Sequence, residues 1–518
     1  MDSNKIKALL VLVIALFGAV YLGVSSATAQ FETIAWVLGG ITLVTCFALG
    51  RKIWLLIPFM FALSMTLRLP SLPDTGLIAQ ILVIGFSVPL FLMRKLAFRL
   101  AFTELEAWIL LVTLFVVQVY MRYPVGINLF GGDTVGGKSY IIYAISLITG
   151  LLLAGLAVPA SDLKWVLRLT ILGGILNLVI GILSYFVPAV AYYTGATISR
   201  SDEVNYENIG QAVDTGAATR RGFLGVFGNN AALWISSFIS PLKAALRPLW
   251  AILLLLVLGA AAMSGFRNFV VSTGLILLLG IAYRSGFVGV LISTVGGAMG
   301  LACLVLINGI HPLPPSVQRS LTFLPGNWEE RYKLDAAASN EWRFEIWREV
   351  LLTDRWIQNK LLGDGLGFTS AELASQMNNR LGARAGVSGF DAQRDSILAS
   401  GDYHSGPVQT IRTIGYLGLL AMILAQVRLA LHAHRQIQRC RNTEWLPLAM
   451  LVGLPLIAYP LYFFFIFGTF KLASISLLMG YGMIRILENN LPLPAWIPRN
   501  RQTFILSTSR SRAPEVPR

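Results

Sequence analysis

The sequence predicts an all-α polytopic membrane protein with about fourteen transmembrane helices. Of its 518 residues, 55% are hydrophobic and only 13% are charged, and the mean hydropathy is +0.68. Because a soluble globular domain carries about a quarter charged residues, this composition excludes a water-soluble fold. Apolar runs of roughly 18 residues or more recur along the whole chain, and each is long enough to cross the hydrocarbon core as a helix.

Each apolar run is expected to form one membrane-spanning helix. The runs lie near residues 6–25, 33–50, 53–67, 76–93, 105–121, 139–158, 164–187, 222–240, 249–263, 268–284, 286–308, 407–430, 446–468 and 472–487. The first has a basic start and ends in the small residues Ala27, Thr28 and Ala29, a pattern that cleaved secretory signals share. Its apolar part is long enough to remain as an anchor, and the topology of the rest is the same in either case.

Basic residues between the spans predict the orientation. With the N-terminus in the cytoplasm, the pairs Arg51-Lys52 and Arg94-Lys95 and the run HAHRQIQRCR (432–441) all face the cytoplasm, while the outer short loops hold few cations. Both chain ends are then cytoplasmic. Two connections are too long to be turns and both face outward, where loops on a rigid scaffold commonly carry function.

These spans and loops give the expected organisation. It comprises N-terminal transmembrane helices over 1–187, an extracytoplasmic loop over 188–221, transmembrane helices over 222–308, a large extracytoplasmic loop over 309–406, C-terminal transmembrane helices over 407–487 and a basic cytoplasmic tail over 488–518.

The positive-inside bias accounts for the net charge of +15. No basic face with interleaved aromatic residues appears, so no nucleic-acid partner is expected. Cys46, Cys303 and Cys440 lie in apolar helices or on the cytoplasmic side and predict neither a disulfide framework nor a metal cluster. Without a His-x-x-x-His, a cysteine pair or an Asp-x-Asp run, no metal site and no cofactor are expected.

Within the large loop, SNEWRFEIWREVLL (339–352) predicts an amphipathic helix on the membrane surface, capped by Ser339 or Asn340. Its apolar residues recur at helical spacing: Trp342, Ile346 and Val350. Arg343 and Trp347 are four residues apart and therefore neighbours on one face, with the arginine at headgroup level. In the LLGDGLGF segment that follows (361–368), the glycines predict a tight turn in which Asp364 is a turn former rather than a catalyst.

Cationic side chains from distant segments are expected to meet at the outer membrane boundary. Arg220 and Arg221 precede one span, Arg267 lies between two spans, and Arg343 lies on the surface helix. A single interfacial arginine is ordinary, but guanidinium groups bind phosphate through paired hydrogen bonds, and a group of them suits a lipid-linked phosphate or diphosphate. No acidic residue lies near the middle of any span, which counts against ion-coupled transport.

His404, one of four histidines, precedes the span at 407–430 in GDYHSGPVQTIRTIGYLGLL (401–420). An imidazole at a helix start can simply cap the helix. It can also take a proton from a hydroxyl group, because it is neutral near pH 7. Arg412, about two turns inside the same span, either holds His404 in place or contacts phosphate, and the sequence does not choose between these roles.

The segment HSGPVQTIRTIGYLG (404–418) resembles the motif of the bacterial O-antigen ligase and O-antigen polymerase superfamily. That motif has a histidine, a small polar residue, nine residues of any kind, a glycine, two residues of any kind and a small residue. The matching positions are His404, Ser405, Gly415 and Gly418. Three further features are similar to the superfamily, and together the resemblance covers residues 190–470. They are the Arg343 and Trp347 helix before GDGLGF, SGFR at 264–267, and RRGFLGVFGNN at 220–230, where Asn229-Asn230 replaces a common Pro-Asn.

The resemblance implies a GT-C-like helical fold in the bacterial inner membrane, with a site that faces the periplasm. It implies a donor glycan on undecaprenyl diphosphate, an acceptor glycan on a lipid, surrounding membrane lipids and other polysaccharide-assembly proteins as partners, and metal-independent inverting transfer. In this reading His404 takes the proton of the acceptor hydroxyl. Arg221, Arg267 and Arg343 stabilise the departing diphosphate, and the supporting residues are Arg220, Trp347, Ser405 and Arg412.

Several functions remain open at this point. A polymerase joins repeat units of an O-antigen or exopolysaccharide, whereas a ligase moves the finished chain to the lipid A core of lipopolysaccharide. Fourteen spans, more than the dozen expected of a ligase, favour the polymerase. A transporter or flippase for the same lipid-linked glycan would also use cations at the membrane boundary, whereas an assembly scaffold would leave the arginines unexplained.

Overall fold

The computed structural model describes residues 31–65, 74–125, 136–187, 190, 220–367, 398, 401, 403–466, 468–492 and 504–507. Among them, nine helices are long and apolar enough to cross a membrane, so the chain is an α-helical membrane protein. Several predicted features lie outside the described residues: the span at 6–25 with its signal-like start, nearly all of the loop at 188–221, residues 368–397 of the large loop and most of the tail.

The chain forms two compact units. Its elements are α2 (Phe31–Leu49), η1 (Gly50–Leu55), α3 (Leu56–Leu63), α4 (Thr75–Leu92), β1 (Arg99–Phe102), α5 (Glu104–Arg122), α6 (Lys138–Gly155), α7 (Ala160–Phe186), α10 (Gly222–Phe238), α11 (Pro241–Ala245), α12 (Pro248–Met263), α13 (Arg267–Ile310), α14 (Pro315–Leu321), α15 (Glu330–Leu352), α18 (Gly406–Cys440), α19 (Leu446–Leu461), η2 (Tyr462–Ile466), α20 (Phe470–Asn490) and β2 (Phe504–Ser507). The first unit comprises Met1–Trp54 and Gly85–Leu96, and in it the rings of Phe47 and Phe86 pack edge to face, 5.2 Å apart.

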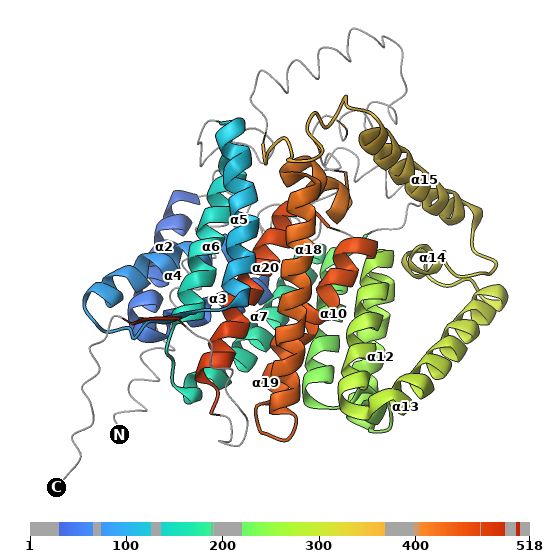
Figure 1. Cartoon of the computed structure of the whole chain (residues 1–518). Helices are drawn as coiled ribbons and strands as arrows, with labels where there is room; N and C mark the ends of the chain where they lie inside the picture. The colour runs from blue at the N-terminus through green and yellow to red at the C-terminus, as the bar shows by residue number, and fades with distance from the viewer. Residues whose placement is uncertain are drawn as a thin grey trace, which may run out of the picture. The chain divides into compact units, whose positions relative to one another are not determined.

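The second unit is a helical bundle that contains every predicted site residue. Its main helix pairs are α6 with α20, α18 with α19, α10 with α12 and α13, α3 with α7, and α5 with α18 (Figure 1). Small residues allow the closest approach: a Cβ placed on Gly150 of α6 would lie 2.7 Å from the Leu478 carbonyl oxygen of α20. Close backbone packing of this kind is how helices associate in a bilayer, where burial of apolar surface provides no drive.

The predicted number of fourteen spans is not confirmed. The predicted runs at 33–50 and 53–67 correspond to α2, η1 and α3, and the last of these has only 8 residues. Helices α10 and α12, with 17 and 16 residues, are shorter than the usual length of a membrane-crossing helix. The predicted pair 268–284 and 286–308 forms α13, in which Gly286 (φ 68°, ψ −166°) breaks the helix between two arms (Figure 1).

Several charged side chains meet around the C-terminal part of α18. Arg428 and Arg435 of α18 pair with Glu104 of α5, at 3.4 and 3.7 Å. Lys164 of α7 pairs with Glu444, just beyond α18, at 3.0 Å. The same region contains a feature that the sequence did not predict, an antiparallel pairing of β1 with β2. At the other end of α18, His404 and the N-cap residue Ser405 come directly before the first helical residue, Gly406.

The surface helix of the large loop is present as α15 but begins earlier than predicted. It starts at Glu330 after an N-cap at Glu329, so Ser339 and Asn340 lie inside the helix and do not cap it. The physical reason is the preceding stretch RYKLDAAA (331–338), which contains strong helix formers and neither glycine nor proline. The predicted apolar face is correct, because Ile346 and Val350 are buried and Trp342 is half-buried.

Candidate functional site

His404 lies in the turn that enters α18 and has a left-handed backbone conformation, with φ of 50°. The residue that caps α18 is Ser405, whose Oγ accepts the Val408 N–H at 3.5 Å, so capping does not explain the histidine. The turn folds back onto the first helical residues. Gly401, also with positive φ, accepts a hydrogen bond at its carbonyl from Gln409 Nε2 at 3.2 Å. The imidazole is thus presented by a compact turn rather than by a helix.

Two tryptophans of α15 contact this turn. The Trp342 and His404 rings lie 5.7 Å apart, centroid to centroid, at an interplanar angle of 39°. The Trp347 Nε1–H donates to the carbonyl of Tyr403, the residue before the histidine, at 2.8 Å. Tyr403 is itself buried in a small hydrophobic core with residues of α15 and α18, including Ile346 and Val408. The surface helix therefore holds His404 in its place.

Arg343 follows Trp342 on α15 and shares its neighbourhood with two other cations. Burial lowers the pKa of the Arg343 guanidinium from its usual value, and the charges of Arg267 and Arg220 lower it further. Arg343 belongs to α15, Arg267 is the first residue of α13, and Arg220 lies just before α10. The structure thus brings together cations that are 47 to 123 residues apart in the chain.

The side chains of Arg220 and Arg221 contact different neighbours. The Arg220 guanidinium lies 5.4 Å from the ring of Phe266, the residue before Arg267. Arg221 instead turns toward α7, where its Nη2 donates to the Tyr185 hydroxyl at 3.1 Å. Sequence analysis gave Arg221 the leading role and Arg220 a supporting one. In the structure, Arg220 is the member of the pair whose charge acts on Arg343.

The SGFR turn (264–267) explains how Arg267 comes to lie beside the Arg220–Arg221 pair. The Arg221 N–H donates to the Ser264 carbonyl at 2.9 Å, and Gly265 adopts a φ of 75°. Arg267 is then the first residue of α13, where the backbone N–H groups of a helix lack partners within the helix and attract anions. The partial positive charge at the N-terminus of α13 and the Arg267 guanidinium therefore attract an anion at the same position.

Close packing of α10 against α13 holds the arginine-bearing ends of these two helices together. Asn229 Oδ1 accepts hydrogen bonds from Ser272 Oγ at 2.9 Å and from Thr273 Oγ1 at 2.7 Å. A Cβ on Gly225 would lie 2.1 Å from the Phe269 ring, so only glycine fits between the two helices. The RRGFLGVFGNN segment thus has a structural role that its resemblance to known motifs did not reveal.

Arg412 is buried, with 5% of its surface exposed, and packs against the turn that carries His404. A Cβ on Gly401 would lie 2.6 Å from Arg412 Nε, so the side chain fills the space beside that turn. Its Nη1 also donates to the Gly365 carbonyl at 3.4 Å. Of the two roles that the sequence left open, these contacts correspond to holding the histidine turn.

The GDGLGF segment forms a turn that packs against α18 where Gly415 interrupts the helix. The Asp364 carboxylate accepts the N–H groups of Gln358 and Asn359 at 2.7 and 2.9 Å, which confirms the prediction that it is a turn former. Gly415 has a φ of 75°, and a Cβ there would lie 2.2 Å from the Leu361 carbonyl oxygen. The first glycine of the 404–418 motif therefore makes room for this turn.

Three residues that the sequence analysis did not select hold the same turn. Arg122, at the end of α5, donates from Nη2 to the carbonyls of Leu362 and Gly363 at 2.9 and 2.7 Å. Gln118 Nε2 donates to the Leu362 carbonyl at 2.8 Å, and the Tyr140 hydroxyl accepts the Leu366 N–H at 3.1 Å. One signal was available: Arg122 is one of the few cations in the outer short loops.

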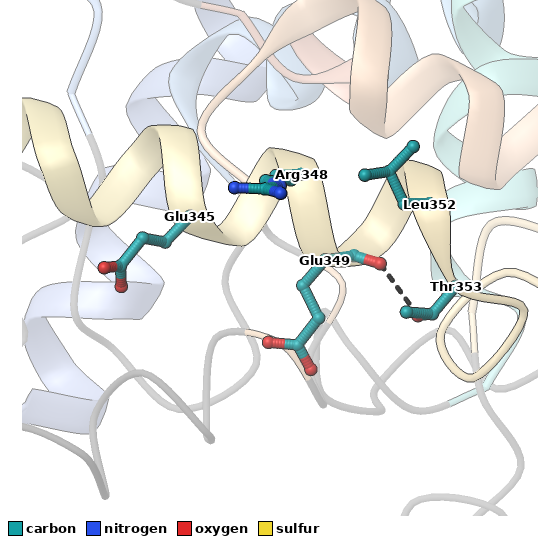
Figure 2. Close-up of a pocket in the computed structure, with 5 residues that line it drawn as sticks. All are labelled: Glu345, Arg348, Glu349, Leu352 and Thr353. Atoms are coloured by element: carbon teal, nitrogen blue, oxygen red, sulfur yellow. Dashed lines mark hydrogen bonds between the residues drawn. The ribbon is translucent and has the colours of Figure 1, made fainter.

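A shallow groove lies on the exposed face of α15, away from His404. It is lined by Glu345, Arg348, Glu349, Leu352 and Thr353, and the Thr353 hydroxyl donates to the Glu349 carbonyl at 2.7 Å (Figure 2). None of the predicted site residues lines it. In the part of the chain that the structure describes, no group of three or more His, Cys, Asp or Glu side chains could hold a metal ion. Metal-free transfer remains a prediction.

No protein-family model matches the chain, and no curated protein matches it either. The likeness to the O-antigen ligase and polymerase superfamily therefore rests on the sequence motifs quoted above alone.

Proposed function

We propose that this protein is a membrane glycosyltransferase that moves a glycan from an undecaprenyl-diphosphate donor to a sugar hydroxyl of a lipid-linked acceptor. One observation carries the proposal. Helix α15 holds the imidazole of His404 beside Trp342, and its next residue, Arg343, lies within the electrostatic reach of Arg267 and Arg220. A base and a group of guanidiniums in one neighbourhood are the two elements that transfer from a diphosphate leaving group requires.

The arginines supply the binding site for the diphosphate. The like charges of Arg267 and Arg220 act against the charge of Arg343, and this repulsion raises the free energy of the empty site. A diphosphate brings the opposite charge and oxygens that accept paired hydrogen bonds from Arg343, Arg267 and Arg220. The N-terminus of α13 adds its partial positive charge. Arg221, whose Nη2 bonds Tyr185, stabilises the same region from its edge.

His404 acts as the general base. In the proposed reaction the acceptor hydroxyl gives its proton to the imidazole while its oxygen attacks the anomeric carbon from the face opposite the diphosphate. The bond between that carbon and the phosphate oxygen breaks, and the electron pair leaves with undecaprenyl diphosphate. The configuration at carbon is inverted, and the arginines stabilise the charge that grows on the leaving group.

We further propose a GT-C-like arrangement in the bacterial inner membrane with the site on the periplasmic face. The support comes from α18. Its C-terminal part carries the basic run 432–441 that the positive-inside rule assigns to the cytoplasm, and His404 precedes its other end. Helix α18 has 35 residues in two arms that meet at Gly415. The longer arm, residues 416–440, is about 37 Å long at about 1.5 Å per residue, which is enough to cross a membrane core about 30 Å thick.

The acceptor that we propose is a second lipid-linked glycan, which makes the protein a polymerase of O-antigen or exopolysaccharide repeat units. A ligase that transfers the finished chain to lipid A core is the alternative. The fourteen spans that favoured the polymerase are not confirmed, since the described residues contain nine helices of membrane-crossing length. Single repeat units on the carrier accumulate when a polymerase is deleted, and long chains accumulate when a ligase is deleted.

The test uses purified protein in detergent with lipid-linked glycans extracted from a strain that lacks the gene. Release of undecaprenyl diphosphate is the readout, because a flippase leaves the glycan linkage intact. We expect His404→Ala to lower the rate by about 100- to 1000-fold. The matched control is His434→Ala, which removes a histidine near the other end of α18, where it bonds Tyr283. Unchanged transfer by well-expressed His404→Ala would reject the base assignment.

A further inference from the structure

The peptide that joins Tyr403 to His404 is held more tightly than its position in a loop requires. His404 has a φ of 50°, a region that costs free energy for any residue other than glycine. Such a conformation persists only where the surroundings enforce it. On one side, the Tyr403 side chain is almost fully buried in the core between α15 and α18. On the other, Ser405 begins α18 as its N-cap.

One hydrogen bond joins this peptide to the surface helix. Trp347 Nε1 donates to the Tyr403 carbonyl at 2.8 Å, across 56 residues of sequence. That carbonyl belongs to the same peptide plane as the His404 N–H, so its direction sets the rotation of the backbone from which the imidazole projects. The imidazole ring itself packs against Trp342.

We propose that Trp347 is a positioning residue for His404: its indole N–H fixes the peptide before the histidine and so aims the imidazole toward the acceptor hydroxyl. This inference rests on the proposed function, because it assumes that His404 is the base. Trp347 touches neither substrate nor the reacting atoms in this assignment. Its contribution is to keep the base within the short distance at which proton transfer occurs.

The expected effect is kinetic rather than a loss of donor affinity. A misplacement of about 1 Å at a reacting group costs on the order of 100-fold in rate. Trp347→Phe keeps an aromatic ring in the core and removes the donor, so we expect kcat to fall by about 10- to 100-fold. The KM for the lipid-linked donor should stay unchanged, since Arg343, Arg267 and Arg220 keep their places.

A second tryptophan of the same core provides the matched control. Trp356 is buried beside Ile346 and Val350, and its Nε1 donates to Glu349 Oε1 at 2.7 Å, within the α15 segment rather than to the histidine turn. Trp356→Phe removes an indole N–H from the same core without touching the 403–404 peptide. A general loosening of the core would lower kcat equally in both variants, whereas the proposal requires the loss to be specific to Trp347→Phe.

A double-mutant cycle with His404→Ala closes the test, with residual transfer and expressed amount measured for each variant. If Trp347 acts through the imidazole, Trp347→Phe has no further effect once His404 is alanine. A further loss in that background, or equal losses in Trp347→Phe and Trp356→Phe, would overturn the inference. A fully active His404→Ala would instead reject the proposed function. Should Trp347→Phe not fold, 3-benzothienylalanine at position 347 removes the N–H while keeping the indole shape, and the same outcomes apply.

Discussion

The rings of Trp342 and His404 lie 5.7 Å apart, and this contact joins a surface helix to the turn that opens α18. Because Arg343 is the next residue of α15, the contact couples the position of the base to that of a phosphate-binding cation. We therefore expect Trp342→Leu to lower kcat by about 10- to 100-fold, through displacement of both groups. Trp342→Phe retains a ring and should keep most of the activity. Equal rates in the two variants would show that the ring contact is dispensable.

Arg343→Gln should lower activity and raise stability at the same time. The substitution removes a half-buried charge whose pKa is lowered by desolvation and by the charges of Arg267 and Arg220. Removing that repulsion should stabilise the ligand-free protein by about 0.5–2 kcal/mol, as other relieved active-site strains do. The rate of transfer should fall by about 100- to 1000-fold, because a donor to the leaving group is lost. Thermal unfolding and release of undecaprenyl diphosphate measure the two effects.

The control for this variant is Arg348→Gln on the exposed face of the same helix. It removes the same charge from α15 without changing the cluster, so neither the unfolding temperature nor the rate should move appreciably. Inorganic pyrophosphate gives a second readout. At 100 times its Kd, a ligand of the folded state adds about 2.7 kcal/mol, and this stabilisation should be present in the wild type and reduced in Arg343→Gln only.

Gly415→Ala should be strongly destabilising. The position has a φ of 75°, and the added Cβ would lie 2.2 Å from the Leu361 carbonyl oxygen. Both the backbone conformation and the contact with the GDGLGF turn are then lost, at a cost of about 1–3 kcal/mol for the strain alone. Gly300→Ala on α13 is the matched control, since a Cβ there meets nothing within 4 Å. Similar unfolding temperatures for the two variants would contradict the assigned role of the kink.

Arg122→Leu should loosen the GDGLGF turn without altering the bundle. The variant removes the Arg122 donor from the Gly363 carbonyl and leaves the Leu362 carbonyl with Gln118 alone, and a buried acceptor left unpaired costs about 1–3 kcal/mol. Hydrogen exchange of residues 359–366 should accelerate relative to the wild type, while α19 exchanges at the wild-type rate. Unchanged exchange in the turn would mean that Gln118 and the backbone bonds to α18 suffice to hold it.

Much of the helical framework could be predicted because apolar runs of membrane length are a strong one-dimensional signal. The break at Gly286 falls at the start of the second of two predicted runs, and the apolar face of α15 follows from the spacing of Ile346 and Val350. The helix start at Glu330 could not be foreseen from a capping residue, because Glu329 makes no side-chain cap. The number of spans is not confirmed where a short helix such as α3 follows a 3₁₀ segment.

The sequence predicted which segments contribute to the site, but not which of their side chains meet there. Arg220 and Arg221 are adjacent in the chain, and which of them faces Arg343 depends on the backbone angles at the N-cap of α10, where Arg221 has φ −120° and ψ 75°. Hydropathy carries no information about that choice. Arg122 contacts the GDGLGF turn across about 240 residues, and nothing local to either segment indicates such a contact. Residues that bind carbonyl groups of a distant loop have no pattern of their own.

Two of the ion pairs near the C-terminal part of α18 should differ sharply in their contribution to stability. Arg485 and Glu106 pair at 2.9 Å with 6% and 1% of their side chains exposed, and Glu106 also accepts the Tyr481 hydroxyl. Lys164 and Glu444 pair at 3.0 Å with 52% and 65% exposed. Glu106→Gln leaves the Arg485 charge buried with a weaker partner, which typically costs about 3–5 kcal/mol. Glu444→Gln should cost at most about 1 kcal/mol, because water screens an exposed pair. Arg485 also pairs with Glu488, at 2.8 Å. The unfolding temperatures of both variants in one detergent therefore compare two pairs of similar distance and unequal burial, and equal shifts would show that Glu488 alone compensates the buried arginine.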